Sequence, residues 1–316
     1  MNQQIASTAA ARPLLSTRSR QLYSPPRRLG NSRKELERSA LEQPLDIFAG
    51  SAALAVAHPG HELCVHGWMQ RARPVVMVLT DGSGGKGSPR LASTERVLQQ
   101  TGARPGCLFG RFPDRQIYQA VLAGNTQLFL DLAAELAVEF VRNQIEIVVG
   151  DAAEGAILTH DLWRGVVNRA IVMARQSLSH PLVSLEFPLE ESRAIPAAAS
   201  ATKYTLRLSD NELREKLAAA RSYRELSHEI ELAISTGGDE GLRCENFLRT
   251  QIRQADTDLS ASPRYELHGE QQVAAGVYSQ VVRYRQHVLP ILRSLQQRHE
   301  AAGIDRHLPE AALNGH

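Results

Sequence analysis

Three histidines in this sequence have the residue type and the spacing that a catalytic metal site requires. His58 and His61 flank a Pro-Gly turn in the string Ala57–Glu62, and His160 lies far along the chain. Because such a turn reverses the chain, the residues on its two sides can face the same point. Imidazole is a common metal ligand, and three imidazoles with an open fourth position form a catalytic zinc arrangement. The spacing alone also fits three isolated loop histidines.

A fourth histidine nearby resembles a zinc-protease motif but does not match it. His66 follows His61 by five residues, one more than the HExxH motif allows. On a helix, five residues correspond to a rotation of about 140° from the starting face, given 3.6 residues per turn. His66 therefore cannot share a face with His61, and we predict a structural role for it.

The elements that would position these histidines alternate along the chain between strand and helix patterns. Continuous apolar runs are typical of strands that are buried on both faces. The runs are Leu54–Ala57, Val75–Thr80, Ile145–Val149 and Leu182–Phe187, and the helical stretches are 61–71, 92–101, 124–142 and 161–176. We predict an α/β fold with a mainly parallel sheet and helices on both faces. Ligands bind beyond the carboxyl ends of the strands in such sheets, so the polar residues after each run are the candidates for a site.

The composition changes near both ends of the chain. Residues 1–45 hold eight basic and three acidic residues and show no apolar period, which predicts a disordered basic arm. Residues 46–190 carry the strand and helix alternation. Residues 191–316 form a predicted C-terminal extension packed on the same domain, with a strand at Lys203–Leu208 and charged helical stretches at 210–235 and 273–300.

Charge and composition exclude several classes of protein. The chain has 316 residues and a net charge of +2, and outside the basic arm the net charge is −3. A nucleic-acid-binding protein would show a basic face on its folded part, so we expect no nucleic-acid partner. No apolar run is long enough to span a membrane. The three cysteines are odd in number and far apart, which favours a reducing, cytoplasmic location.

Five strings follow one another in a characteristic order. They are AVAHPGHE (55–62), VVMVLTDGSGG (75–85), RLASTERVLQQTGA (90–103), FPD (112–114) and THDLWRGVVNRAI (159–171). Over about residues 50–190 they resemble the PIG-L/LmbE-like N-acetylglucosaminyl deacetylases. The resemblance implies a Rossmann-like fold, a bound zinc ion or another divalent metal, and hydrolytic removal of acetyl groups from N-acetylated amino-sugar conjugates. The expected partner is therefore a small molecule of that class.

The resemblance also assigns candidate ligands. That family carries AHPDDE after its first strand and HPDH later in the chain. His58 matches the first ligand, His61 stands where the family has its second ligand, an Asp, and His160 matches the third ligand. The resemblance therefore implies three histidines at a site that has two histidines and a carboxylate in the family, and this set also suits zinc.

Two departures affect proton transfer. Gly60 stands at the position of the family's general base, and Ile157 stands at the position of its catalytic histidine. Neither residue can move a proton, and general acid–base catalysis contributes roughly 10²–10⁴ in rate. Glu62 is the nearest remaining carboxylate, so we predict it as the catalytic group. Alternatively, Glu62 orients a ligand histidine or caps the start of the helix.

Two further residues are candidates for substrate contact. Arg90 aligns with a substrate-contacting arginine of the family, and Asp114 follows a predicted loop or strand end. Each also fits a structural role, a solvated surface arginine for Arg90 and a turn or helix cap for Asp114.

Two other functions remain open at this point. The loop Gly82–Gly87 satisfies GxGxxG after a strand, as a nucleotide-cofactor site would. The next helical stretch, however, begins only near Ala92, too far away for a phosphate to meet its N-terminus. A catalytically degenerate relative, which binds a sugar conjugate or a partner without hydrolysis, would also lose both proton-transfer positions.

Overall fold

A computed structural model describes residues 46–84, 87–189, 202–249 and 262–297 of the chain. All of them belong to the structural unit that begins at Pro44. The predicted basic arm, residues 1–45, lies outside the described residues and stays a prediction. The division of the remaining chain at residue 190 also stays a prediction.

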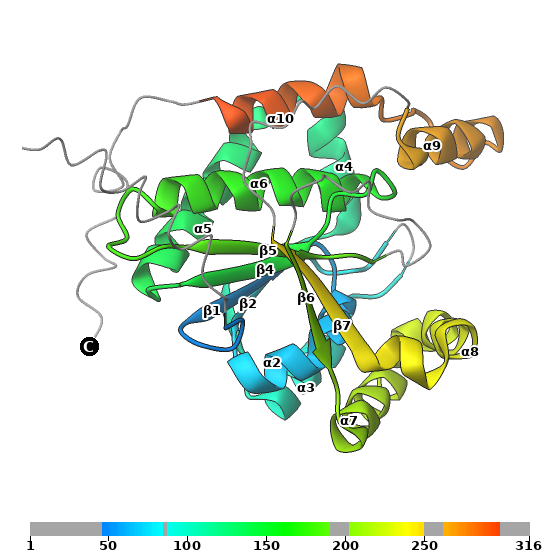
Figure 1. Cartoon of the computed structure of the whole chain (residues 1–316). Helices are drawn as coiled ribbons and strands as arrows, with labels where there is room; N and C mark the ends of the chain where they lie inside the picture. The colour runs from blue at the N-terminus through cyan, green and yellow to red at the C-terminus, as the bar shows by residue number, and fades with distance from the viewer. Residues whose placement is uncertain (1–45, 85–86, 190–201, 250–261, 298–316) are drawn as a thin grey trace, which may run out of the picture. The chain divides into compact units, whose positions relative to one another are not determined.

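The strands of the described residues form a single sheet in the order β3-β2-β1-β4-β5-β7-β6 (Figure 1). They are β1 (Ala52–Val56), β2 (Val75–Thr80), β3 (Arg104–Phe112), β4 (Ile147–Asp151), β5 (Val183–Phe187), β6 (Thr202–Arg207) and β7 (Cys244–Arg249). Strands β1 to β5 pair in parallel, and β7 pairs antiparallel with both β5 and β6. The mainly parallel α/β sheet predicted from the apolar runs is confirmed.

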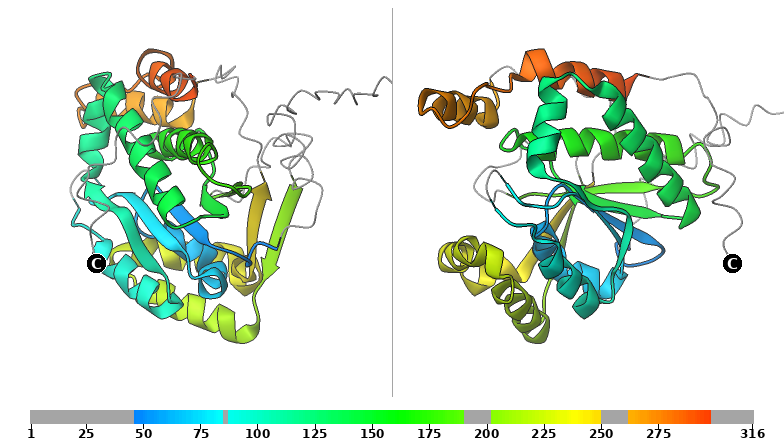
Figure 2. Two further views of the ribbon diagram at one scale, coloured as in Figure 1. Left: turned by 90° about the vertical axis from the view of Figure 1, so that its left-hand side faces the viewer. Right: turned by 180° about the vertical axis from the view of Figure 1, so that it is seen from behind.

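Helices connect the strands and cover both faces of the sheet. They are α2 (His66–Ala72), α3 (Leu91–Thr101), α4 (Asp114–Leu122), α5 (Thr126–Arg142), α6 (Leu158–Ala174), α7 (Asp210–Arg221), α8 (Ser227–Arg243), α9 (Arg264–Ala274) and α10 (Leu289–Gln296), with short helical turns η1 (His61–Val65), η2 (Arg224–Leu226) and η3 (Tyr284–Val288). Helices α5, α6 and α10 lie on one face, and α2, α3 and α7 lie on the other (Figures 1 and 2).

Two hydrophobic cores follow from the alternation of side chains along each strand. On β1, Ala53 and Ala55 pack into the core that includes α5, α6 and α10. Leu54 and Val56 pack into the core that includes α2, α3 and α7. With both faces of the central strands covered, polar side chains can meet only where the strands end, and this places the site at the carboxyl edge.

Strands β3 and β7 were not predicted, and their sequences explain why. The sequence of β3 contains Arg104, Pro105 and two glycines, and its register with β2 shifts twice, which an edge strand tolerates. In β7, Glu245 and Arg249 are buried together with Phe247. Because two of these three inward residues are charged, the apolar alternation that would indicate a strand is lost.

The chain beyond residue 190 contributes more than helices. Strands β6 and β7 extend the sheet, and α10 packs Ile291, Leu292 and Leu295 into the core beside α6. The helical stretch predicted over 210–235 is divided between α7, η2 and α8. The helical stretch predicted over 273–300 is helical at the end of α9, in η3 and in α10, and non-helical between Ala274 and Tyr284; residues 298–300 lie outside the described residues. In the part of the chain that the structure describes, no helix has the length and apolarity to cross a bilayer.

Candidate metal centre

The first part of the site is the turn between β1 and η1. His61 N donates to His58 O at 3.4 Å, and Leu63 N donates to Gly60 O at 3.2 Å, so the chain passes directly into the helical turn η1. Gly60 has φ of 107°, which side-chain-bearing residues rarely adopt. A Cβ atom at Gly60 would also lie 2.4 Å from Leu226 Cδ1. The turn therefore requires glycine, and the family's base could not fit here without a change at Leu226.

The structure brings the three candidate histidines together. The ring centroids of His58 and His61 are 5.3 Å apart, those of His58 and His160 are 5.3 Å apart, and those of His61 and His160 are 4.7 Å apart. His160 reaches the group from the first turn of α6, which begins beyond the carboxyl end of β4. The imidazoles thus meet at the edge where the parallel strands end, as in other α/β sites.

Sequence reasoning missed a fourth member of this cluster. Asp151 is the last residue of β4 and is buried. Its Oδ2 atom accepts hydrogen bonds from Ala57 N at 2.7 Å and from His61 Nδ1 at 3.0 Å. The sequence does contain a signal for Asp151. It is the first charged residue after the apolar run that ends at Val149, and polar residues that follow such runs are candidates for a site.

His61, Asp151 and His160 each offer a ligand atom, and these atoms lie within 4.8 Å of one another. Asp151 Oδ1 and His160 Nε2 are buried and have no hydrogen-bond partner among the described residues. Buried polar atoms are otherwise nearly always satisfied, because leaving one unpaired costs about 1–3 kcal/mol. Two imidazoles and a carboxylate are a known donor set for zinc and for other divalent ions. The residues present therefore fit a metal ion.

The protonation of the cluster also suits a cation. Burial, and then the charge of His61, lower the pKa of His160 to about 3, so its imidazole is neutral and keeps a lone pair. Burial raises the pKa of Asp151, but the charge of His61 and the hydrogen bonds to the carboxylate outweigh burial and leave it below its ordinary value. A neutral imidazole and an ionised carboxylate are the forms that bind metals.

His58 lies beside this trio and is already held by three polar groups. Its Nδ1 atom lies 2.7 Å from Thr80 Oγ1 and 2.8 Å from Asp114 Oδ1, and its Nε2 atom lies 2.5 Å from Thr159 Oγ1. Thr80 Oγ1 donates to Ala57 O at 3.2 Å, so it accepts from His58 Nδ1–H. That tautomer leaves the lone pair on Nε2, the nitrogen that faces Thr159.

Asp114, whose predicted substrate contact stays a prediction, touches two parts of the site. One oxygen faces His58, and the other accepts from Gly84 N at 2.7 Å. Burial raises the pKa of Asp114, but the interaction with His58 outweighs burial and lowers the pKa to about 2. The carboxylate therefore stays ionised and orients the imidazole, in the manner of an acid that holds a ligand histidine.

Glu62, the predicted catalytic group, is fully buried in η1. Its Oε2 atom accepts from Gly60 N at 2.6 Å, and its Oε1 atom has no hydrogen-bond partner among the described residues. Burial raises the pKa of Glu62 above its ordinary value. The position fits the shaping of the Gly60 turn, and a catalytic role for Glu62 stays a prediction.

Three backbone donors of the glycine-rich loop are used within the protein. Ser83 N donates to Asp81 Oδ1 at 2.9 Å and Gly87 N to Ser83 O at 2.6 Å, while Gly84 N donates to the Asp114 carboxylate. Arg90 Nε donates to Gly82 O at 2.7 Å, so this predicted substrate contact supports the loop. A phosphate group needs free N–H donors, and these residues offer it neighbouring carboxylates instead. The geometry disfavours the nucleotide-cofactor alternative.

The two remaining sequence assignments concern Ile157 and His66. Ile157 is the N-cap residue of α6 and is exposed, which leaves the family's catalytic histidine position without a polar group. His66 is buried as the first residue of α2, outside the His61–Asp151–His160 trio. Burial and the charge of Lys216 lower the pKa of His66 to about 4.

Comparison with known proteins gives structural likenesses at low identity. No protein-family model matches the chain, and no curated protein matches it. The conserved protein TT1542 from Thermus thermophilus is similar, with 18% identity and a TM-score of 0.46 over 67% of this chain and 99% of that one. The zinc-inhibited form of teicoplanin deacetylase Orf2 has 13% identity and a TM-score of 0.43 over 64% and 99%. The A40926 pseudoaglycone deacetylase Dbv21 has 16% identity and a TM-score of 0.37 over 62% and 96%. Likenesses of this strength assign no function to the chain.

Proposed function

We propose that this protein is a metal-dependent amide hydrolase that removes the acetyl group from an N-acetylated amino-sugar conjugate. The observation that carries the proposal is the convergence of His61, Asp151 and His160, in which two buried polar atoms, Asp151 Oδ1 and His160 Nε2, have no hydrogen-bond partner among the described residues. The sequence resemblance to LmbE-type deacetylases supports the finer part, the acetyl group and the amino sugar. Zinc is the proposed ion, because two imidazoles and one carboxylate suit it.

The residues divide into groups that hold the ion and groups that manage the proton. His61, Asp151 and His160 would hold the ion, with His58 as the adjacent imidazole. When bound, zinc supplies a Lewis acid that polarises an amide carbonyl and acidifies water. The reaction also needs a group that accepts a proton and returns it to the departing amine. His58 and Glu62 are the two side chains at the turn that could do so in place of Gly60 and Ile157.

His58 has the better placement for that proton. Its Nε2 atom faces the hydroxyl of Thr159, the residue before His160, and its Nδ1–H is fixed between Thr80 and Asp114. An imidazole held on one nitrogen by a carboxylate keeps one orientation and one tautomer, which general acid–base catalysis requires. Glu62 is held by Gly60 N and is fully buried, so it would act only through the turn.

Metal analysis of purified protein tests the ion. We expect near-stoichiometric zinc in the wild type and its loss in His160→Ala, with His228→Ala on the exposed side of α8 as the matched control. Retention of zinc in His58→Ala, with loss of activity, would assign His58 to proton transfer, whereas loss of zinc would make it a fourth ligand. A wild-type protein that binds no divalent ion stoichiometrically would refute the proposal.

A deacetylation screen then tests the reaction. Acetate release would be measured over a panel of N-acetylglucosamine conjugates, with the zinc-loaded wild type beside Glu62→Gln. Unchanged activity in Glu62→Gln would remove that carboxylate from the mechanism. Absence of acetate release from all conjugates would contradict the hydrolase proposal even if the metal were bound.

One observation favours a second candidate, a sugar-conjugate-binding protein without hydrolysis. The Leu226 side chain fills the space beside Gly60, where the family has its general base. For this candidate, calorimetry would detect binding of a conjugate to the zinc-loaded wild type, and no acetate would be released.

A further inference from the structure

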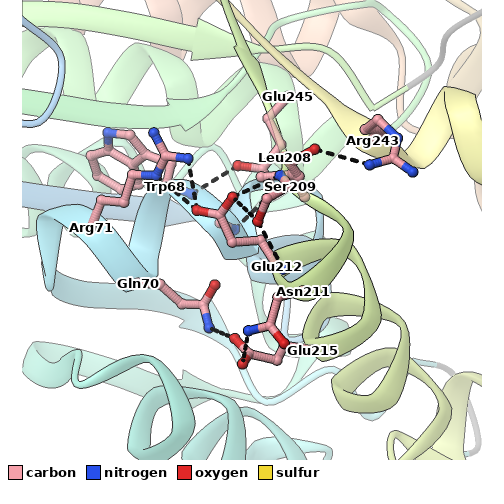
Figure 3. Close-up of polar contacts among 11 residues, drawn as sticks. Trp68, Gln70, Arg71, Leu208, Ser209, Asn211, Glu212, Glu215, Arg243 and Glu245 are labelled. Atoms are coloured by element: carbon pink, nitrogen blue, oxygen red, sulfur yellow. Dashed lines mark hydrogen bonds and ion pairs between the residues drawn. The ribbon is translucent and has the colours of Figure 1, made fainter.

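The turn that carries His61 is held from one side by the distant segment Thr202–Arg249. The chain passes from η1 into α2 between Val65 and His66, and this junction packs against α7 and β7. Figure 3 shows the polar contacts between α2, α7 and β7. Two buried charges in this interface, Lys216 and Glu245, stand apart from the exposed pairs around them.

Glu245 of β7 completes the N-terminus of α2. Its Oε1 atom accepts from Gly67 N at 2.9 Å. Its Oε2 atom accepts from Trp68 N at 2.8 Å (Figure 3). These amides belong to the first turn of α2, where a helix offers no intrahelical acceptor. A Cβ atom at Gly67 would lie 2.2 Å from Leu208 Cδ2, so glycine lets the two segments approach this closely. The carboxylate thus fixes where α2 begins.

Lys216 of α7 ties the same carboxylate to η1. Its Nζ atom lies 2.9 Å from Glu245 Oε1 and donates to Cys64 O at 3.1 Å. Cys64 lies in η1, three residues after His61. The ammonium group and the carboxylate therefore hold the backbone on both sides of the η1–α2 junction.

Two further side chains lie against the start of the same turn. A Cβ atom at Gly60 would lie 2.4 Å from Leu226 Cδ1 and 3.9 Å from Tyr223 Cζ. The Tyr223 hydroxyl is itself anchored to α3, since it lies 2.9 Å from Thr94 Oγ1. Tyr223 is fully buried. The turn that contains His61 is thus fixed at its beginning by η2 and its flanking Tyr223, and at its end by Lys216 and Glu245.

We infer that the Lys216–Glu245 pair is a positioning device for the metal centre, because it fixes the junction that directs His61 toward Asp151 and His160. This inference rests on the proposed metal site. Of the three ligand candidates, His61 is the one that lies on the element contacted by this charge pair, through the hydrogen bond from Lys216 to Cys64 O. If the junction relaxes, the imidazole of His61 moves while Asp151 and His160 stay on β4 and α6.

The test compares two conservative variants on either end of α2. Glu245→Gln keeps the side-chain volume but loses one of the two capping acceptors and leaves Lys216 without a carboxylate. Arg71→Gln is the matched control, because it breaks the exposed Arg71–Glu212 pair at the other end of α2, away from η1. Zinc affinity would be measured by competition with a chromophoric chelator, and the visible absorption spectrum would be recorded after loading with cobalt(II).

We expect Glu245→Gln to bind zinc about 10-fold more weakly, the lower end of the range for residues that support metal ligands. We also expect its cobalt(II) bands to shift or weaken, since these bands follow ligand geometry and not global stability. Arg71→Gln should match the wild type in both measurements. Wild-type affinity and spectrum in a folded Glu245→Gln would overturn the inference.

A second variant covers the case in which Glu245→Gln does not fold. Lys216→Met/Glu245→Gln removes both buried charges, so neither is left unpaired. Weaker zinc binding in this folded double variant would support the inference, and unchanged binding would overturn it. Wild-type protein that binds neither zinc nor cobalt(II) would refute the metal site itself, which distinguishes that failure from the failure of the positioning role.

Discussion

Two polar regions of this molecule contrast in how their charges are satisfied. At the carboxyl edge, Asp151 Oδ1 and His160 Nε2 are buried without a hydrogen-bond partner among the described residues. At the η1–α2 junction, both oxygens of the equally buried Glu245 are bonded, to two backbone amides and to Lys216. Buried polar atoms are nearly always hydrogen-bonded. An unpaired oxygen on Asp151, beside an unpaired nitrogen on His160, therefore leaves room for an external partner, whereas the bonded oxygens of Glu245 leave none.

Replacing Asp151, at the carboxyl edge of the sheet, should have the largest effect on zinc affinity. In Asp151→Asn the amide still can accept from Ala57 N, but the negative charge that attracts a cation is lost. We expect zinc affinity to fall by at least about 100-fold, because losing a residue that only supports a metal ligand already costs about 10- to 100-fold. Chelator competition measures it, and Asp131→Asn on the exposed side of α5 serves as the control. Wild-type affinity in Asp151→Asn would break the contrast between the two regions.

Removing the Lys216 charge from the η1–α2 junction should lower the free energy of unfolding even when no metal ion is bound. Lys216→Met leaves Glu245 buried without its cation, and breaking a buried pair in this way costs about 3–5 kcal/mol. Urea unfolding of the metal-free protein measures the loss. The contrast would fail if Lys216→Met were as stable as the wild type, because Glu245 would then need no internal partner.

Acid should destabilise the junction through His66. Burial and then the Lys216 charge lower the pKa of His66 to about 4, while Glu215 opposes the shift. The unfolded chain takes up its proton near pH 6.5, so stability falls as pH falls from about 6.5 to about 4, by about 3 kcal/mol in total. Unfolding measured across this range should show a flatter profile in His66→Leu. An unaltered profile in that variant, with His228→Gln as the control, would contradict the assignment.

The exposed Arg71–Glu212 pair at the same interface should contribute least to the free energy of unfolding. Arg71 and Glu212 meet at 2.7 Å on the surface, where side-chain entropy and solvent screening offset the attraction. We expect Arg71→Gln to change the free energy of unfolding by less than about 1 kcal/mol, and the difference should shrink in high salt. A loss comparable to that of Lys216→Met would mean that burial is not what separates the two pairs.

The sequence predicted the parallel core of the sheet well because its strands are continuous apolar runs. It missed β3, whose Pro105 and glycines suit an irregular edge, and β7, whose inward positions include Glu245 and Arg249. Strand β7 was missed because the buried charge of Glu245 interrupts the apolar alternation that would have indicated a strand. In our inference, that same charge has a role, since it positions the η1–α2 junction.

The histidine cluster was predicted from a turn and a resemblance, and the structure brings those side chains together. Asp151 was missed because the resemblance supplied three histidines and left no position for a carboxylate. The contacts of Asp114 were also missed, because its partners, His58 and Gly84, are distant in sequence and come together only through the crossover connections of the sheet. Spacing along one chain carries no information about such contacts.

Glu245 lies 178 positions after the amide of Gly67 that it caps. On a chain growing from the ribosome, all three ligand candidates emerge before β7 is synthesised, so the nascent protein would expose them before the turn of His61 is fixed. Contacts between such remote positions form slowly, because a long loop must close first. In our proposal, metal binding at full affinity would therefore wait for the synthesis of β7, and a product truncated before β7 would lack the contacts that Glu245 makes with α2.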